Sequence, residues 1–375
     1  MAHDDAPSGC LARTPENVLL FRFTEELTMR AKLLAVAAVL VATSVGRAED
    51  GLTKGTPELK SATALAFGAK GILFIGDSAS ATIFAIDTGD TKSSSDKPVN
   101  VEKIDGKVAA ALGVTEKEVK INDVKVNPAS GNVYLAVTRG TGAGTPAIVK
   151  VTREGTAEPL ALKDVMSAKI AVTGQDKGKA TSFTSMAFLG DKLYVAGLSN
   201  EEFASTLWSI AYPFKDVAGA GIEIFHGAHG KLETKSPIRT FVPYKIGKED
   251  NIMASYTCTP LVKIPVSELK AGAKVKGTTI AELGNRNQPL DMIAYTKDGK
   301  DYLLSANSAH GVIKIPTAEF GSSAPITKQT GIAGPKYEKI TELKDVVQLD
   351  KFDDTRAILL IKSADGFDLK TVPLP

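Results

Sequence analysis

The chain has 375 residues, a formal net charge of +2 at neutral pH and a hydrophobic content of 43%. It carries no long run of lysine or arginine, which argues against a nucleic acid as its partner. Its length and composition are those of a globular protein that can bury a sizeable core without disulfide bonds.

The first 48 residues carry a targeting pattern. Met29–Lys32 is basic, residues 33–45 are apolar, and the small residues Gly46 and Ala48 stand three and one before a cut after Ala48. This pattern is typical of a secretory signal peptide over residues 29–48. We interpret residues 1–28 as an extension produced by a mis-assigned start, with an ordinary N-terminal extension as the alternative. The apolar stretch is shorter than the ~20 residues that span a bilayer, so we expect no membrane span. Residues 49–375 are expected to form one periplasmic or secreted domain.

A pattern of three short apolar runs recurs six times between Ser61 and Pro375. The first run of each copy is centred on Ala66, Lys125, Ala187, Phe241, Ile293 and Gln348. The runs are rich in Val, Ile, Tyr and Phe and are bounded by Gly, Asp and Pro, which is typical of β-strands. A period somewhat above the ~40–50 residues of common blades predicts an all-β protein, a six-bladed β-propeller with enlarged loops. A seventh blade would require a copy that the pattern does not show.

Fourth strands are predicted at Val99–Ile104, Pro159–Leu162, Gly221–Phe225, Thr278–Leu283 and Pro325–Gln329. The sixth copy leaves no room for one before the last residue, so residues 51–59 are predicted to supply it. That pairing would close the ring and remove its exposed strand edges.

A short helical insertion is predicted over residues 105–119. Thr115 and Glu118 have the spacing of a capping box, and the residues before them form an apolar stripe. Because such stripes face a core, we expect the helix to cover the gap between two blades, with a lid as the alternative.

Chain direction places the second-to-third-strand loops and the connections between blades on one face of the propeller, which we call the loop face. Loops on a rigid scaffold commonly carry binding residues, so this face is the predicted functional one. The candidate contacts for a protein or small-molecule ligand are Asn122, Asp123, Arg139, Asn200, Glu201, Arg286, Asn287, Asp291 and Asn307. The chain shows no nucleophile–base pair and no convincing carboxylate pair, so the primary hypothesis is a non-catalytic binding module.

All the histidines after the predicted cleavage site also fall on the loop face. His226 and His229 lie in a glycine-rich connection, and Cys258 and His310 follow in the next two blades. Imidazole and thiolate are ligands that suit zinc or copper. The alternative is that the histidines bond nearby backbone and that the lone thiol acts as a small apolar group.

The segment NDVKVNPASGNVYLA, residues 122–136, resembles the gluconolactonase/SMP-30-like group of six-bladed lactonases. The resemblance implies a calcium ion at the mouth of the central channel, bound by Asn122, Asp123 and Asp291, and a calcium-dependent lactonase or esterase activity. Blade three departs from the family pattern, with Thr184–Ser185 in place of an Asn-Gly pair. The architecture as a whole is similar to that of exported bacterial propellers.

Overall fold

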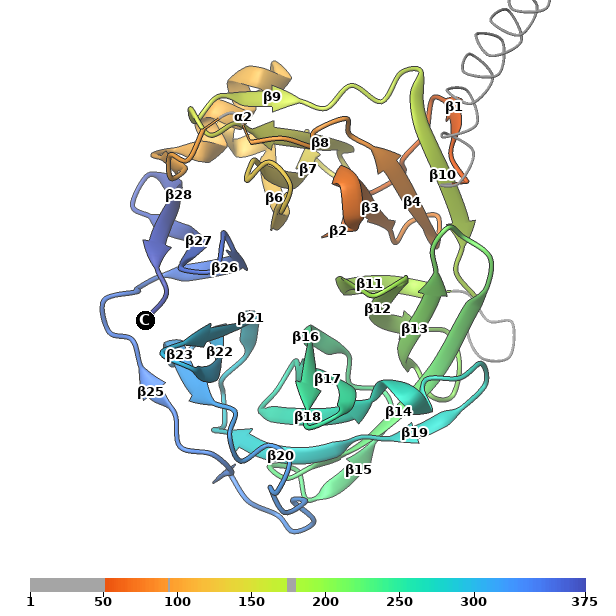
Figure 1. Cartoon of the computed structure of the whole chain (residues 1–375), viewed down its shortest axis with the longest axis vertical. Coiled ribbons are helices and arrows are strands. Elements are labelled where there is room, and N and C mark those ends of the chain that lie inside the picture. Colours follow the sequence, from red (N-terminus) through yellow and green to blue (C-terminus); the bar gives the residue numbers. More distant parts are fainter. Residues whose placement is uncertain (1–50, 94, 174–179) are drawn as a thin grey trace, which may run out of the picture. The chain divides into compact units, whose positions relative to one another are not determined.

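The computed structural model describes residues 51–93, 95–173 and 180–375. The predicted extension and signal peptide therefore lie outside the described residues. Residues 51–375 form a ring of six β-sheets around a central channel, so the all-β, six-bladed prediction is confirmed (Figure 1). Within the described ranges, no helix is both long enough and apolar enough to span a bilayer.

In each blade the first strand lines the channel, and the strands after it lie progressively farther out. Blade one contains β2 (Ala64–Phe67), β3 (Ile72–Asp77), β4 (Thr82–Asp87), β10 (Val165–Ala171) and β1 (Thr53–Gly55). Blade two contains β6 (Val119–Val126), β7 (Val133–Arg139), β8 (Thr145–Val151) and β9 (Ala157–Pro159). Blade three contains β11 (Ala180–Leu189), β12 (Lys192–Ser199), β13 (Ser205–Ala211) and β14 (Val217–His226), which pairs with both β15 (Lys231–Glu233) and β19 (Lys274–Lys276).

Blade four contains β16 (Ile238–Ile246), β17 (Glu249–Tyr256), β18 (Pro260–Pro265), β20 (Thr278–Leu283) and β24 (Ile332–Ala333). Blade five contains β21 (Pro289–Lys297), β22 (Lys300–Asn307), β23 (Gly311–Pro316) and β25 (Glu338–Lys339). Blade six contains β26 (Val346–Lys351), β27 (Arg356–Ser363), β28 (Gly366–Pro373) and β5 (Asn100–Val101).

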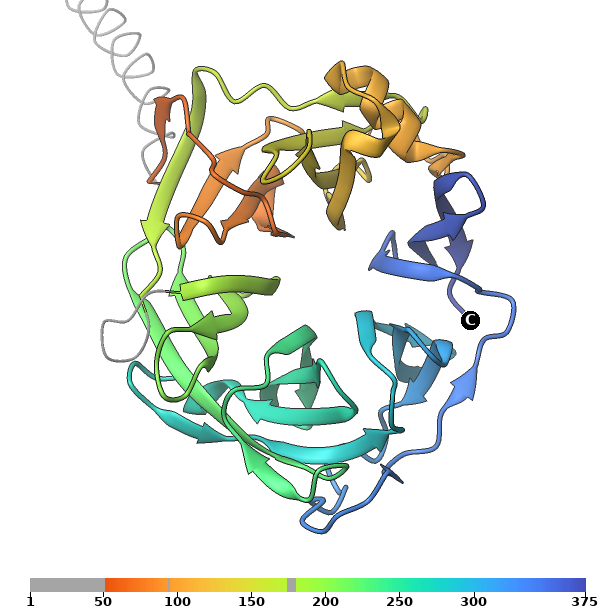
Figure 2. The same ribbon diagram turned by 180° about the vertical axis from the view of Figure 1, so that it is seen from behind.

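Each pair of neighbouring blades shares an apolar core, and these cores define the order of the ring. Leu65 of blade one packs in one cluster with Tyr134 of blade two, and Phe74 of blade one packs in another with Trp208 of blade three. Blade two shares its other core with blade six. The order around the ring is therefore two, one, three, four, five, six, so blades one and two are interchanged relative to the sequence (Figures 1 and 2).

Two crossing segments produce this interchange. After β4 the chain passes to the outer edge of blade six as β5 and then builds blade two. It returns along the outer edge of blade one as β10 before it begins blade three. Asp90 holds the first crossing against blade two, because its carboxylate accepts hydrogen bonds from Ser130 and Tyr134 at 2.7 and 3.0 Å.

The predicted ring closure is therefore wrong. Residues 51–59 do not pair with blade six, because β1 pairs with β10 on the outside of blade one. The strand that completes blade six is β5, from within the segment Val99–Ile104 that was expected to finish blade one. Pro325–Gln329 forms no strand, and β25 takes the outer place in blade five. The predicted fourth strand of blade four, in contrast, coincides with β20.

The helical insertion is confirmed as α2 (Ile104–Leu112) followed by the short 3-10 helix η2 (Glu116–Glu118). Both bonds of the predicted capping box are present. Helix α2 packs against β28, β6 and β9, so it covers the junction between blades six and two, as its apolar stripe indicated. Two further 3-10 turns are η1 (Ala69–Gly71) and η3 (Val266–Glu268).

Candidate metal centre

The channel mouth on the loop face is a small polar cavity of about 140 Å³, lined by the inner strands of blades two to six and by Thr63, just before β2 of blade one. Asn122 and Asp123 line it, but both side chains are engaged by neighbouring blades. The Asn122 amide donates to the Ala62 carbonyl oxygen at 2.9 Å and to the Thr138 hydroxyl at 2.8 Å. The Asp123 carboxylate accepts the Leu65 backbone N–H at 2.7 Å.

Asp291 makes an equivalent link between blades five and six. Its carboxylate accepts the backbone N–H groups of Met292 at 2.8 Å and Leu349 at 3.2 Å, and the Thr240 hydroxyl at 3.1 Å. Of the oxygen atoms that the gluconolactonase resemblance assigns to calcium, those of the Asp123 and Asp291 carboxylates are thus occupied by hydrogen bonds within the ring.

The other predicted contacts on the loop face fall into two groups. Arg139 and Arg286 are exposed, and Asn200 and Glu201 lie in the loop between β12 and β13. Asn287 and Asn307 are buried, and the Asn287 amide donates to the Asn307 side-chain oxygen at 2.9 Å. This bond joins the loop before β21 to the end of β22, which is a structural role.

A tight turn brings two of the predicted metal ligands together. His226 ends β14, and the N–H groups of His229 and Gly230 both donate to its carbonyl oxygen, at 3.1 and 2.8 Å. Gly230 has φ +67°, a conformation that glycine adopts without strain. The turn places the imidazole centroids 3.8 Å apart. The HxxH spacing therefore converges through a turn, although it lacks the register of a helix.

Glu233, on β15, fixes the orientation of both imidazoles. Its carboxylate oxygens lie 3.0 Å from His226 Nδ1 and 2.7 Å from His229 Nδ1. Burial opposes ionisation of Glu233, but hydrogen bonds from Ser236, His229 and His226 outweigh it and lower the pKa to about 2. The carboxylate is therefore an anion that only accepts hydrogen bonds, so each Nδ1 donates its hydrogen to Glu233. The other ring nitrogen of His226, Nε2, lies 3.4 Å from the Thr259 hydroxyl.

Cys258, in the turn between β17 and β18, completes a group of three possible ligands. One donor atom from each of His226, His229 and Cys258 lies within 4.8 Å of the other two. Donor atoms on one tetrahedral zinc ion are about 3.3–3.8 Å apart at the usual bond lengths, so closure needs a movement of roughly 1 Å. The exposed His229 side chain and the half-buried thiol can make this adjustment.

His310 does not join this group. Its Nε2 lies 2.7 Å from the Leu283 carbonyl oxygen, and its ring lies beside Tyr337. Bonding to nearby backbone is the alternative that the sequence left open for these histidines. The structure therefore brings three of the four predicted metal ligands together.

The acidic residues around the histidines were not predicted from the sequence. Besides Glu233, the buried Glu282 accepts hydrogen bonds from the Gly227 N–H and the Thr259 hydroxyl, and burial raises its pKa above the usual range. Glu233 could have been found from the pattern HGAHGKLE, because a hairpin turn at residues 226–230 returns the chain beside His226. Glu282 lies in the next blade and has no comparable local signal.

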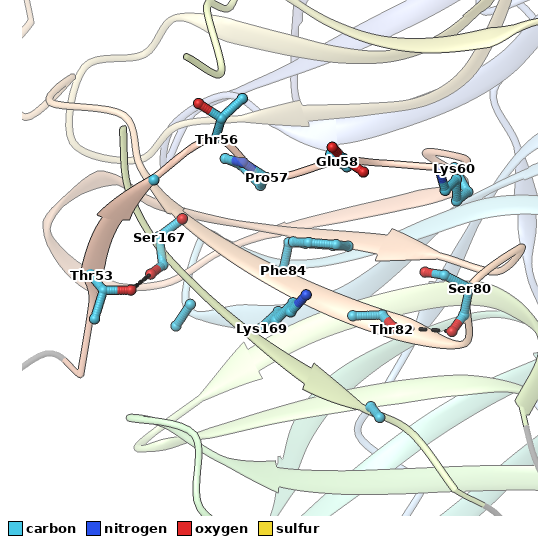
Figure 3. Close-up of a pocket in the computed structure, with 13 residues that line it drawn as sticks. Thr53, Thr56, Pro57, Glu58, Lys60, Ser80, Thr82, Phe84, Ser167 and Lys169 are labelled. Carbon is cyan, nitrogen blue, oxygen red and sulfur yellow. Dashed lines mark hydrogen bonds between the residues drawn. The ribbon is translucent and has the colours of Figure 1, made fainter. Parts of the chain in front are cut away.

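His226, His229 and Cys258, which we call the trio, line a cavity of about 620 Å³ together with Glu233. Its other lining residues include Lys231, Leu232, Lys235, Pro237 and Gln288. A larger hollow of about 760 Å³ lies on the outside of blade one, between the segment from Thr53 to Lys60 and strands β4 and β10 (Figure 3). Its lining combines threonine, serine and lysine side chains with Phe84 and has no histidine or cysteine. Of these two cavities, the one lined by the trio is therefore the better candidate for a metal site, because it contains histidine and cysteine side chains.

Comparison with known proteins adds no functional information. No protein-family model and no curated protein matches the chain. Similar solved structures include the plexin A4 full extracellular region, at 8% identity and a TM-score of 0.40, covering 86% of this chain and 40% of that one. A chain of the mitotic checkpoint complex has 9% identity and a TM-score of 0.38, covering 86% of this chain and 93% of that one. The luciferin-regenerating enzyme has 10% identity and a TM-score of 0.32, covering 86% and 96%.

Proposed function

We propose that the protein is a β-propeller binding module that holds a zinc or copper ion on its loop face. One observation carries the proposal: a single carboxylate, Glu233, fixes two imidazoles, each of which offers a ring nitrogen within 4.8 Å of the Cys258 thiol. Histidines that bind metal ions commonly donate their other ring N–H to a carboxylate in this way. Two imidazoles and a thiolate suit zinc or copper better than calcium or magnesium.

Metal analysis of the purified chain tests this proposal directly. We expect about one equivalent of zinc or copper and a thermal stability that rises when the ion is added. Saturation to 100 times the dissociation constant should stabilise the fold by about 2.7 kcal/mol. Cys258→Ser and His229→Ala should remove the effect, whereas His310→Gln, a histidine outside the trio, should keep it. An unchanged stability with zinc and copper, together with a metal-free preparation, would contradict the proposal.

Glu233→Gln tests the role of the carboxylate separately from the ligands themselves. The amide removes the fixed negative charge and the preference for hydrogen on both Nδ1 atoms, so we expect metal affinity to fall about 10- to 100-fold. Nitrogen NMR of the metal-free protein should show that the tautomers are no longer fixed. Glu158→Gln, which alters an exposed ion pair with Lys150, is the control that should change neither property.

The calcium-dependent hydrolase implied by the gluconolactonase resemblance stays a second prediction. Asp123 and Asp291 do line the channel cavity, which favours it, although their oxygens bond neighbouring strands. Stabilisation by calcium, and lactone or ester turnover that is lost in Asn122→Ala, would support it over the zinc or copper module. Export to the periplasm or medium also stays a prediction, because it depends on residues 29–48, and sequencing the mature N-terminus would test it.

A further inference from the structure

The protein supplies three donor atoms, whereas zinc is usually four-coordinate. The two nearest carboxylates are engaged elsewhere. Glu233 accepts hydrogen bonds from both histidines and from the Ser236 hydroxyl, the last at 2.7 Å. Glu282 accepts from Thr259 and from the Gly227 N–H. In the part of the chain that the structure describes, the ligand group therefore ends at His226, His229 and Cys258.

The fourth coordination position of a metal ion held by these three residues can be reached from solvent. All three residues line the 620 Å³ cavity, whose volume is typical of sites for small ligands. The His226 side chain is 1% exposed and that of His229 is 46% exposed, so one histidine lies inside the wall and the other lies at the opening. A metal ion with three protein ligands and one open position can exchange a bound water for another ligand.

The charges around the cavity favour an anion. A divalent ion would be neutralised by the Cys258 thiolate and the Glu233 carboxylate. Lys231, whose Nζ lies 3.8 Å from a Glu233 oxygen, and Lys235 then leave an excess of positive charge, even when the buried Glu282 carboxylate is counted as an anion. The exposed side chain of Leu232, with 47% of its surface accessible, and Pro237 add apolar surface to the same cavity. An anion with an apolar portion matches this lining better than an inorganic ion.

We infer that the open coordination position binds the carboxylate group of a small organic acid, whose apolar part lies against Leu232 and Pro237. The inference rests on the proposed function and extends it by naming the class of ligand. Binding replaces a metal-bound water with a carboxylate oxygen and forms no covalent bond with the protein. Lys231 and Lys235 act by attracting the anion and do not bind the metal.

Cobalt provides a visible signal for this test, because its absorption reports both thiolate ligation and coordination number. The full chain is loaded with Co²⁺ and titrated with benzoate and, in parallel, with the neutral analogue benzamide. We expect benzoate to change the cobalt spectrum saturably and benzamide to leave it unchanged. The double variant Lys231→Ala, Lys235→Ala should bind Co²⁺ normally and benzoate about tenfold more weakly. Lys192→Ala, an exposed lysine at the opposite end of blade three, should behave as the wild type.

The possible outcomes separate the two proposals. If Co²⁺ gives no thiolate-dependent spectrum, metal binding itself is refuted and the inference falls with it. If Co²⁺ binds but benzoate leaves the spectrum unchanged, metal binding stands and the open site is refuted. Equal responses to benzoate and benzamide, or a double variant with unchanged benzoate affinity, would overturn the assignment of an anionic ligand.

Discussion

Three aspartates on the inner strands connect neighbouring blades at the channel. Asp123 accepts the N–H of Leu65, Asp350 accepts that of Val126, and Asp291 accepts that of Leu349, so each bond joins two adjacent inner strands. Inner strands have an unpaired edge that faces the channel, and buried backbone N–H groups require acceptors. The carboxylates supply these acceptors, which explains why acidic side chains tolerate burial at the centre of the ring.

The largely buried Asp123 carboxyl, whose side chain is 14% exposed, should make stability depend on pH. Burial raises its pKa to about 6, Lys125 opposes the shift and Asp291 adds to it. The folded protein then binds a proton more tightly than the unfolded chain, so this group stabilises the fold below about pH 4, and that contribution is lost as the pH rises to about 6. The change is at most roughly 3 kcal/mol. Burial of Asp350 shifts its pKa in the same direction.

Urea unfolding of the wild type and Asp123→Asn between pH 4 and 7 measures this effect. The difference in unfolding free energy between the two proteins should fall from pH 4 to pH 6, because only the wild type gains a buried charge. Asp365→Asn, which alters an exposed side chain, should give a difference that does not vary with pH. A wild-type advantage that grows with pH over this range would contradict the assignment.

Strand β5 is the element that closes the ring. It pairs with β28 through only two residue pairs, and side-chain bonds supplement them. The Thr371 hydroxyl accepts the Val99 N–H at 3.0 Å and donates to the Val99 carbonyl oxygen at 2.8 Å. A short closing strand thus depends on one threonine to satisfy both backbone groups of the residue before it.

Thr371→Val should therefore destabilise the ring although it preserves side-chain shape. The substitution leaves the buried Val99 N–H without its acceptor, for which we expect a loss of about 1–3 kcal/mol in denaturant unfolding. Thr53→Val is the matched control, because the Thr53 hydroxyl on β1 makes only an exposed contact of 3.5 Å with Ser167. Its effect should stay within about 0.5 kcal/mol. If Thr53→Val lowers the free energy of unfolding more than Thr371→Val does, β1 and not β5 closes the ring.

The hairpin between β14 and β15 shows how far local pattern could define the candidate site. The sequence identified His226 and His229 from their spacing, and the turn that joins them is encoded by the same glycine-rich segment. Cys258 and Glu282 lie in blade four, so their approach depends on how two blades pack. The sequence groups His310 with the trio because it also lies on the loop face. That face extends around the whole ring, so two residues on it can still be far apart.

At the scale of the molecule, the interchange of blades one and two is the feature that sequence order could not reveal. It places residues near 100 beside the last strands of the chain. Lys103 Nζ lies 3.5 Å from a carboxylate oxygen of Asp365, with both side chains largely exposed. A zero-length carbodiimide cross-link should therefore join these two residues, and peptide mass spectrometry would detect it.

Lys103→Arg provides the control, because a guanidinium does not form the amide that the cross-link requires. The cross-link should disappear in this variant while circular dichroism stays unchanged. A ring closed by residues 51–59 would instead bring Lys54 beside β28. A cross-link from Lys54 to Asp368, in place of the one from Lys103, would overturn the interchanged order.

By itself the sequence determined the all-β propeller, its six blades and the helical insertion with the capping box of η2. These properties follow from alternation, turn residues and capping, which act over a few neighbouring residues. The tertiary structure decided which segment closes the ring, the order of the blades and which of the four predicted metal ligands meet. Edge strands such as β5 and β1 are short and carry similar patterns, so their partners depend on packing between distant segments. Packing between distant segments also decides that His226, His229 and Cys258 share a site and that His310 lies outside it.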